Sequence, residues 1–215
     1  RSLVGSERCI RASLSGGGSI KKNGVYDQVM AALKKREVLE FGGIEANPDY
    51  DTLMRAVKKI QKKGVNFLLA VGGGSVIDGV KFIALAALYP GKDPWEILSG
   101  DGLSQATEAL PFGTVLTLPA TGSEMNNGAV ISRRSIQEKL SFDSDLVFPR
   151  FSILDPETTY SLPQKQVRNG LVDAFVHVLE QYLTYRVGAH VQDRQSEAIL
   201  MALMDIAPTA LRMPP

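Results

Sequence analysis

The sequence has almost no cysteine, no strong net charge and no long apolar run. Cys9 is the only cysteine, which excludes an internal disulfide and favours a reducing, cytoplasmic setting. The formal net charge is +1 with basic residues scattered along the chain, so neither nucleic acid nor an anionic membrane is an expected partner. The longest apolar stretch, Phe82 to Tyr89, is too short to span a bilayer. Arg1–Ser13 has no apolar core, and we expect no signal peptide.

What is present is the composition of a globular protein. Hydrophobic residues make up 44% and charged residues 22% of the chain, which are ordinary values for a soluble domain. The length of 215 residues suits one large domain, or one domain and the start of another.

Buried strands and helices alternate over the first three quarters of the chain. Strands are predicted at Glu37–Phe41, Phe67–Val71, Thr114–Leu118 and Ser152–Asp155, and a hairpin at Ala129–Ser132 with Lys139–Phe142. Asn47-Pro48 predicts the cap and first turn of a helix that ends at Gly64. From Ser161 onward the pattern is helical, with Ser161 and Gln164 as a capping box. We therefore expect an α/β domain with a mainly parallel sheet over residues 1–161, followed by the start of an all-helical domain over 162–215.

Three consecutive glycines follow the apolar run Phe67–Val71. Gly72-Gly-Gly-Ser75 then opens a helix, whose free N–H groups and dipole suit a phosphate. Ile77 stands where the usual dinucleotide fingerprint has its third glycine, and a tight strand–helix turn without a ligand is the alternative. Asp78, in the first helical turn, either bonds amides and ligand hydroxyls or simply complements the helix dipole.

A second glycine turn, Gly16-Gly-Gly-Ser19, precedes another helical segment. Its small hydroxyl and the following Lys21 and Lys22 would accept an adenosine 2′-phosphate, which favours NADP(H) over NAD. The alternative is a loop with two solvated lysines. Small polar side chains also follow the strand Thr114–Leu118, namely Thr117, Thr121, Ser123, Asn126 and Asn127. They suit either a ligand site at the strand's carboxyl end or a polar surface loop.

Polar residues recur every four positions in the helical tail. Asn169, Asp173, His177 and Gln181 share one helical face bordered by apolar residues, so we expect a buried polar seam. Asp173 and His177, one turn apart, either bind one divalent cation or hydrogen-bond to each other. The second histidine, His190, lies beyond this helix and is not an expected ligand.

Taken in order, these segments resemble the iron-containing (group III) alcohol dehydrogenases, in the branch of NADPH-dependent aldehyde reductases and butanol dehydrogenases. The resemblance covers about Ser15 to Leu211 and rests on five segments: Phe41–Pro48, Leu69–Asp78, Leu116–Glu124, Ala129–Ser132 and Asn169–Tyr182. It implies a dehydroquinate synthase-like arrangement, with an N-terminal dinucleotide-binding domain and a C-terminal helical domain. Family members often self-associate, so a homodimer is among the implied partners.

The resemblance also implies roles for individual residues. Gly17, Gly18, Ser19 and Asn47 would approach the adenosine end of the cofactor, Gly73, Gly74 and Ser75 its pyrophosphate, and Asp78 its nicotinamide side, where it is the implied catalytic residue. Thr117, Thr121, Ser123, Asn126 and Lys139 would line the cofactor cleft. Asp173 and His177 would bind a divalent metal, Fe²⁺ or Zn²⁺, which polarises the oxygen of an alcohol or aldehyde while hydride passes to or from NADP(H).

Two departures from the family pattern limit these implications. Arg1–Ala12 does not match the family's opening strands, which leaves an edge of the cofactor sheet undefined. Two further metal-binding histidines belong to a later helical region that the chain does not reach, so we expect a truncated chain with an incomplete metal site. The alternatives are an inactive NADP(H)-binding fragment and a glycerol dehydrogenase-like polyol dehydrogenase.

Overall fold

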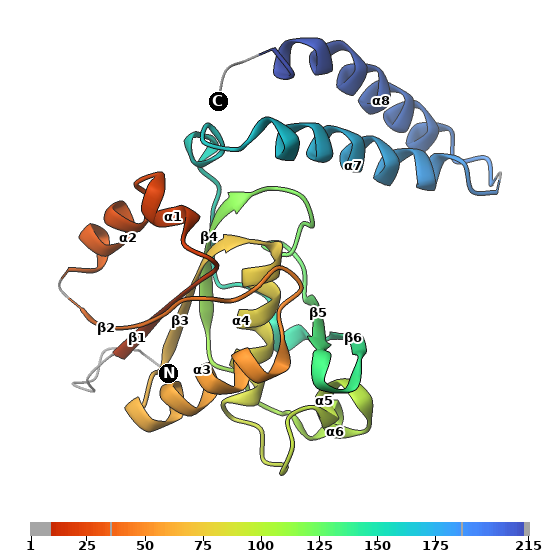
Figure 1. The fold of residues 1–215 in the computed structure, drawn as a ribbon. Helices are drawn as coiled ribbons and strands as arrows, with labels where there is room; N and C mark the ends of the chain where they lie inside the picture. The colour runs from red at the N-terminus through yellow and green to blue at the C-terminus, as the bar shows by residue number, and fades with distance from the viewer. Residues whose placement is uncertain (1–9, 35, 186, 213–215) are drawn as a thin grey trace. The chain divides into compact units, whose positions relative to one another are not determined.

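In the computed structural model the chain divides into two units, one up to Thr158 and one from Thr159 onward (Figure 1). The structure describes residues 10–34, 36–185 and 187–212. Cys9 and most of the Arg1–Ser13 segment therefore lie outside the described residues.

The first unit is built on a parallel sheet of five strands in the order β2-β1-β3-β4-β7. The strands are β1 (Ile10–Ser15), β2 (Glu37–Phe41), β3 (Phe67–Gly73), β4 (Phe112–Leu118) and β7 (Ser152–Ile153). Sequence analysis missed β1, and its expectation of an undefined sheet edge is wrong for residues 10–15, because β1 pairs with β2 on one side and β3 on the other. The last strand is also two residues shorter than predicted.

Helices cover both faces of the sheet. The helices of the first unit are α1 (Ser19–Lys22), α2 (Val25–Leu33), α3 (Tyr50–Lys63), α4 (Gly74–Ala86), α5 (Glu96–Ser99) and α6 (Gly102–Gln105). Short 3₁₀ turns lie at Arg134–Ile136, Asp145–Val147 and Pro156–Thr159. Leu68 and Ala70 of β3 belong to the larger core, which includes α3 and α4. Leu69 and Val71 pack on the opposite face with residues of α1 and α2. Burial on both faces explains why β3 is apolar without alternation.

The start of α3 differs from its prediction. Its cap is Asp49, whose carboxylate accepts the N–H of Asp51 at 3.1 Å. Asn47, the predicted cap, instead has a positive φ of 55° in the turn before the helix. Asp49 takes the cap position in place of Asn47 because its side chain also offers a capping oxygen and lies two residues closer to the amphipathic stretch of the helix.

The predicted hairpin is confirmed. β5 (Gly128–Arg133) and β6 (Glu138–Asp143) pair antiparallel, with Ser132 opposite Lys139. Ser132 also donates its N–H to Pro48 O at 2.9 Å, which attaches the hairpin to the segment before α3.

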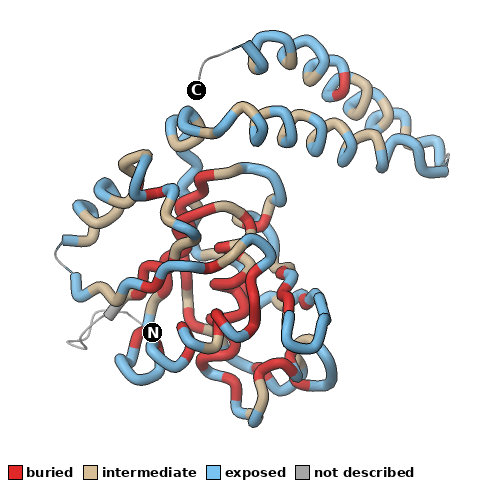
Figure 2. Tube along the Cα trace, viewed as in Figure 1, coloured by how far each residue is buried: buried red, intermediate tan, exposed pale blue. Residues whose placement is uncertain are grey.

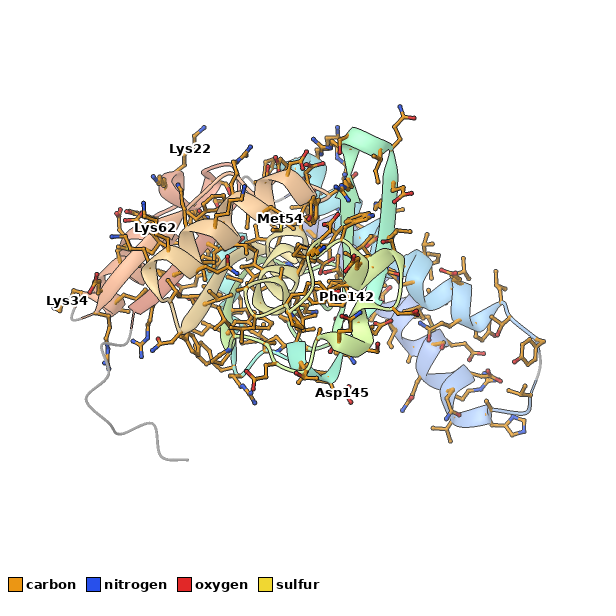
Figure 3. All side chains as sticks on the ribbon, turned by 90° about the horizontal axis from the view of Figure 1, so that it is seen from below. Lys22, Lys34, Met54, Lys62, Phe142 and Asp145 are labelled. Carbon is orange, nitrogen blue, oxygen red and sulfur yellow. The ribbon has the colours of Figure 1, made fainter. Side chains whose placement is uncertain are left out.

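Burial is concentrated in the sheet, α3 and α4 of the first unit (Figure 2). Lys22, Lys34 and Lys62 lie at its periphery with exposed side chains (Figure 3). The large two-sided core is what allows the sheet to hold its strand ends in fixed positions.

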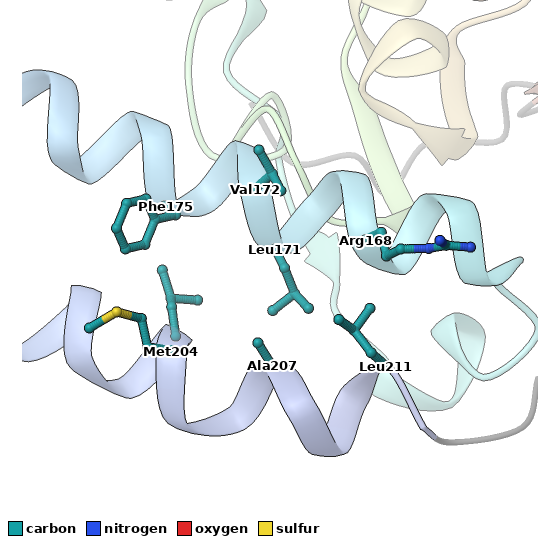
Figure 4. A pocket seen from close by; sticks show the side chains of 8 residues that line it. Arg168, Leu171, Val172, Phe175, Met204, Ala207 and Leu211 are labelled. Carbon is teal, nitrogen blue, oxygen red and sulfur yellow. The ribbon is translucent and has the colours of Figure 1, made fainter.

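The second unit is a helical hairpin of α7 (Gln164–Tyr182) and α8 (His190–Ala210). The helix begins at Gln164, with Pro163 at its cap position and no side-chain cap there, two residues later than a cap at Ser161 predicts. A cavity of about 360 Å³ lies between the helices, with Leu171 and Phe175 facing Met204 and Ala207 (Figure 4). Two helices cover only one side of each other, which leaves many apolar residues of this unit exposed.

Among the described helices, none combines the length and the apolar character needed to cross a bilayer.

Candidate functional site

The two glycine turns lie beside each other at the carboxyl edge of the sheet. β1 pairs with β3 so that Ser15 is opposite Val71, and each strand then runs directly into its glycine turn. The chain leaves β1 for β2 on one side and enters β3 on the other, so strand order reverses between β1 and β3. Open α/β sheets bind ligands at such a switch point. Sequence analysis predicted both turns but, having missed β1, gave no reason for them to be neighbours.

The start of α4 is open to a ligand. Gly73 occupies its cap position and no side chain caps the helix. The first backbone N–H groups of this 13-residue helix are therefore available to an anion, with the dipole favouring negative charge. Ser75 lies in this first turn, and its Oγ accepts the N–H of Asn47 at 3.3 Å.

Close packing contributes to the choice of glycine in both turns. A Cβ at position 72 would lie 2.6 Å from Val76 Cγ2, and one at position 74 would lie 2.2 Å from Thr121 Oγ1. A Cβ on Gly16 would contact Val76 at 3.4 Å, which shows how closely the two turns approach each other. Gly17 is different, since a Cβ there would meet nothing within 4 Å. Thus Gly72 and Gly74 are required by the fold itself, whereas Gly17 faces open space.

A cavity of about 280 Å³ adjoins the Gly16–Ser19 turn and is also lined by Gly42 and Gly43. Lys21 lines it, whereas Lys22 is not among its lining residues and is exposed. Glu40, near the end of β2, lines it as well and accepts a hydrogen bond of 2.9 Å from Tyr26 Oη. This hydrogen bond is the main reason that the pKa of Tyr26 is raised. Sequence analysis missed Glu40, whose carboxylate opposes a 2′-phosphate that Lys21 would attract.

Three residues predicted to contact the cofactor meet at a second point. Lys139 of β6 donates a hydrogen bond of 2.8 Å to Asn47 Oδ1, and the N–H of Asn47 bonds to Ser75 of α4. The structure therefore brings Asn47, Ser75 and Lys139 together beside the start of α4.

The segment after β4 is attached to α4 through Asp78. The Asp78 carboxylate accepts Ser123 Oγ at 2.6 Å on one oxygen and the N–H of Val130 at 3.1 Å on the other. Burial raises the pKa of Asp78, while these two donors and Lys81 act in the opposite direction. Ser123 is only 2% exposed, so its hydroxyl faces inward. Thr117 is likewise buried in β4, whereas Thr121 is exposed.

Lys81 is a functional candidate that sequence analysis did not identify. Its side chain is fully buried, and its ammonium donates to Asn126 Oδ1 and Gly128 O, both at 2.7 Å. Burial lowers the pKa of Lys81 to about 8, against the opposing effect of Asp78, Glu124 and Asp143. A usable signal was present, since a single lysine in a helix that is otherwise apolar on nearly every side needs buried partners.

The polar face of α7 is exposed within its unit. His177 Nε2 lies 3.5 Å from Asp173 Oδ2, and the two side chains are 61% and 50% exposed. Asn169 and Gln181 are exposed too, so the predicted burial of this seam is not found. The reason is that α8 covers the neighbouring face of α7, through Leu171 and Phe175.

The residues of α7 do not by themselves form a metal site. Within residues 10–34, 36–185 and 187–212, no group of three or more His, Cys, Asp or Glu side chains is arranged to hold an ion. Asp173 and His177 supply two donors of the right chemistry, but divalent metals in proteins take at least three protein ligands in most sites. His190 opens α8 and adds no third donor.

A parallel sheet with glycine turns at its switch point defines the class of α/β domains that bind dinucleotides. The chain belongs to the iron-containing alcohol dehydrogenase family, whose model matches residues 9–156. The family identified from the sequence motifs is thereby confirmed.

Among its relatives, the NADPH-dependent aldehyde reductase YqhD of Escherichia coli is 59% identical over 93% of this chain and 51% of its own length. A probable NADH-dependent butanol dehydrogenase of Bacillus subtilis is 48% identical over 90% of this chain and 50% of its own length. A crystal structure of E. coli YqhD superposes with a TM-score of 0.88 at 54% identity, covering 99% of this chain and 54% of that one. The chain thus spans about half the length of the curated relatives it matches.

Proposed function

We propose that this chain binds NADP(H) at the carboxyl edge of β1 and β3, and that the protein containing it reduces aldehydes or oxidises alcohols. One observation carries the proposal: two glycine turns adjoin at the switch point, and one of them opens an uncapped helix. The nicotinamide supplies the chemistry by giving or taking a hydride. The similarity to an NADPH-dependent aldehyde reductase and to NADH-dependent butanol dehydrogenases supports this reaction class.

Each part of the cofactor has its own set of proposed binding residues. The start of α4 at Gly73, Gly74 and Ser75 binds the pyrophosphate through backbone N–H groups. Gly17 and Gly18 line the cavity assigned to the adenosine ribose, with Ser19 next to them in the chain, and Lys21 in the same cavity favours a 2′-phosphate. Asn47 and Lys139 are hydrogen-bonded to each other beside the start of α4, and Thr121 faces that helix start.

Asp173 and His177 are proposed as two ligands of a divalent metal, iron or zinc, whose other ligands are not among the described residues. The single cysteine supports a cytoplasmic location for the protein.

Gly17→Asp tests the proposed site without disturbing the fold. Gly17 has an ordinary φ and open space for a side chain, so the substitution adds a negative charge where phosphates should lie. NADPH binding, followed by cofactor fluorescence, should weaken about tenfold or more. Gly170→Asp is the matched control, since Gly170 of α7 also has open space and an ordinary φ. Saturable NADPH binding that is equal in all three proteins would place the site elsewhere, and no binding by the wild type would refute the proposal for this chain.

The exposed, two-donor arrangement of Asp173 and His177 favours a second candidate, a module that binds NADP(H) without turnover. NADPH titration together with metal analysis and an aldehyde-dependent NADPH oxidation assay separates the two. Binding without metal or turnover identifies the module, whereas metal-dependent oxidation identifies the enzyme.

A further inference from the structure

Helix α4 carries a charged pair, Asp78 and Lys81, one turn apart. Its other side chains between Val76 and Ala86 are apolar and buried, and Lys81 is buried with them. A buried ammonium is tolerated only with close polar partners. The partners of Lys81 therefore identify the part of the chain that α4 holds in place.

The hydrogen-bond partners that the structure gives to the two side chains all lie in residues 119–130, which we call the 119–130 segment. Asp78 accepts hydrogen bonds from Ser123 Oγ and the N–H of Val130, at 2.6 and 3.1 Å. Lys81 donates to Asn126 Oδ1 and Gly128 O, each at 2.7 Å. Asn126 Oδ1 also accepts the N–H of Gly128 at 3.1 Å, so its acceptor capacity is used internally. The two donors, Ser123 and Val130, thus flank the two acceptors, Asn126 and Gly128, and the four bonds fix the register of the segment against α4.

Thr121 lies in this segment and faces the start of α4. Its Oγ1 accepts the N–H of Ser123 at 3.3 Å, so the attachment of Ser123 to Asp78 also orients Thr121. The same oxygen lies 2.2 Å from where a Cβ of Gly74 would be, directly beside the uncapped helix turn. The position of Thr121 is consequently set through Asp78 and Lys81.

We propose that Asp78 and Lys81 form a clamp that positions the 119–130 segment on the dinucleotide site, with Lys81 as a positioning residue. Ser123 and Asn126 serve this clamp instead of contacting the cofactor, and Thr121 is the residue of the segment that does. This inference rests on the proposed NADP(H) site.

Lys81→Met tests the clamp, because methionine keeps an unbranched side chain but removes the donors. Lys62→Met, at an exposed position of α3, is the matched control. The probes are NADPH and adenosine 2′-monophosphate, which carries the adenosine end of the cofactor and lacks both the pyrophosphate and the nicotinamide. We expect Lys81→Met to weaken NADPH binding about tenfold, while binding of adenosine 2′-monophosphate changes less than about twofold. Lys62→Met should leave both probes unchanged.

Equal weakening of the two probes would indicate a general loss of structure and overturn the inference, as would unchanged NADPH affinity in folded Lys81→Met. Ser123→Ala provides a second route if Lys81→Met does not fold, since it removes one bond to Asp78 and should give the same selective loss in smaller measure. An unchanged NADPH affinity in Ser123→Ala, or an equal loss of affinity for both probes relative to the wild type, would then refute the clamp.

Amide hydrogen exchange separates failure of the clamp from failure of the proposed function. Without ligand, residues 119–130 should exchange faster in Lys81→Met, or in Ser123→Ala, than in the wild type, while β1 and β2 stay protected. If the wild type binds no NADPH, the proposed function fails and this exchange pattern alone decides whether the clamp exists. If it binds NADPH but exchange of the segment is unaltered, the clamp fails and the function stands.

Discussion

The ammonium of Lys139 donates a hydrogen bond of 2.8 Å to Asn47 Oδ1, 92 positions earlier in the chain. Asn47 in turn bonds through its N–H to Ser75 at the start of α4. A single asparagine therefore connects the hairpin, the segment before α3 and the proposed pyrophosphate turn. Four predictions follow from this and the neighbouring contacts.

Asn47 has a φ of 55°, a left-handed conformation that asparagine tolerates better than most side chains. Asn47→Ala should lower the free energy of unfolding by about 1 kcal/mol more than Asn47→Gly does, because both lose the bond to Lys139 but only alanine is strained. Urea denaturation of the two variants measures the difference. Equal stabilities would show that this backbone conformation relaxes at no cost.

Ser19→Asp should shift cofactor preference from NADPH toward NADH. The new carboxylate would repel a 2′-phosphate and accept a hydrogen bond from the ribose hydroxyl of NADH. It would lie next in the chain to Gly18, which lines the cavity that Glu40 also lines. We expect NADPH affinity to fall about tenfold or more. Fluorescence titration with both cofactors is the measurement, and Ser135→Asp, at an exposed position, controls for charge alone. An unaltered preference would count against placing the 2′-phosphate beside Ser19.

Gly74→Ala should destabilise the chain by about 1–3 kcal/mol, because its Cβ would lie 2.2 Å from Thr121 Oγ1 and 2.9 Å from Thr121 Cγ2. Combining it with Thr121→Ala removes both offending atoms and should restore part of the loss. A double-mutant cycle by chemical denaturation measures this coupling. Additive effects of the two substitutions would mean that the backbone moves to avoid the contact.

The stability lost in Lys81→Met should depend on pH. Burial lowers the pKa of Lys81 in the folded chain to about 8 from its ordinary 10.5. Between these values the unfolded chain binds more protons than the folded chain, so folding stability rises with pH. The wild type should therefore gain about 2 kcal/mol over Lys81→Met between pH 7 and pH 10. Denaturation of both proteins at the two pH values tests this, and a constant difference would show that the lysine titrates normally.

Helices and strands that are determined by residues close together in the chain could be predicted from the sequence. The continuous apolar run of β3, the helical stripe of α3 and the turn residues of the β5–β6 hairpin each report their own structure. β1 was missed although Ile10–Ser15 alternates apolar and polar residues, which is itself a strand signal, and its place inside the sheet is visible only in the structure. The cap of α3 was misplaced because Asn47 and Asp49 both offer a capping oxygen, and α7 is preceded by Pro163 with no side-chain cap.

The same division holds for the site. Glycines 72–74 and the Asp173–His177 spacing are visible along the chain, as is the order of motifs that identifies the family. Glu40 and Lys81 were not recognisable as site residues, because their significance comes from neighbours: Glu40 from Tyr26 and the glycine turn beside it, Lys81 from a segment 45 residues later. Sequence likewise predicted Asp78, Ser123 and Asn126 as a cofactor set, and the structure shows their polar atoms bonded to other parts of the protein.

The amino-acid sequence was enough to predict the family, the α/β pattern and two phosphate-compatible turns, since each depends on residues close together in the chain. The three-dimensional arrangement was needed to show that these turns adjoin, that Asp78 and Lys81 hold the same segment, and that the polar face of α7 is open within its unit. The reason is that strand pairing and buried hydrogen bonds join residues by distance in space, and spacing along the chain does not fix which strand ends meet.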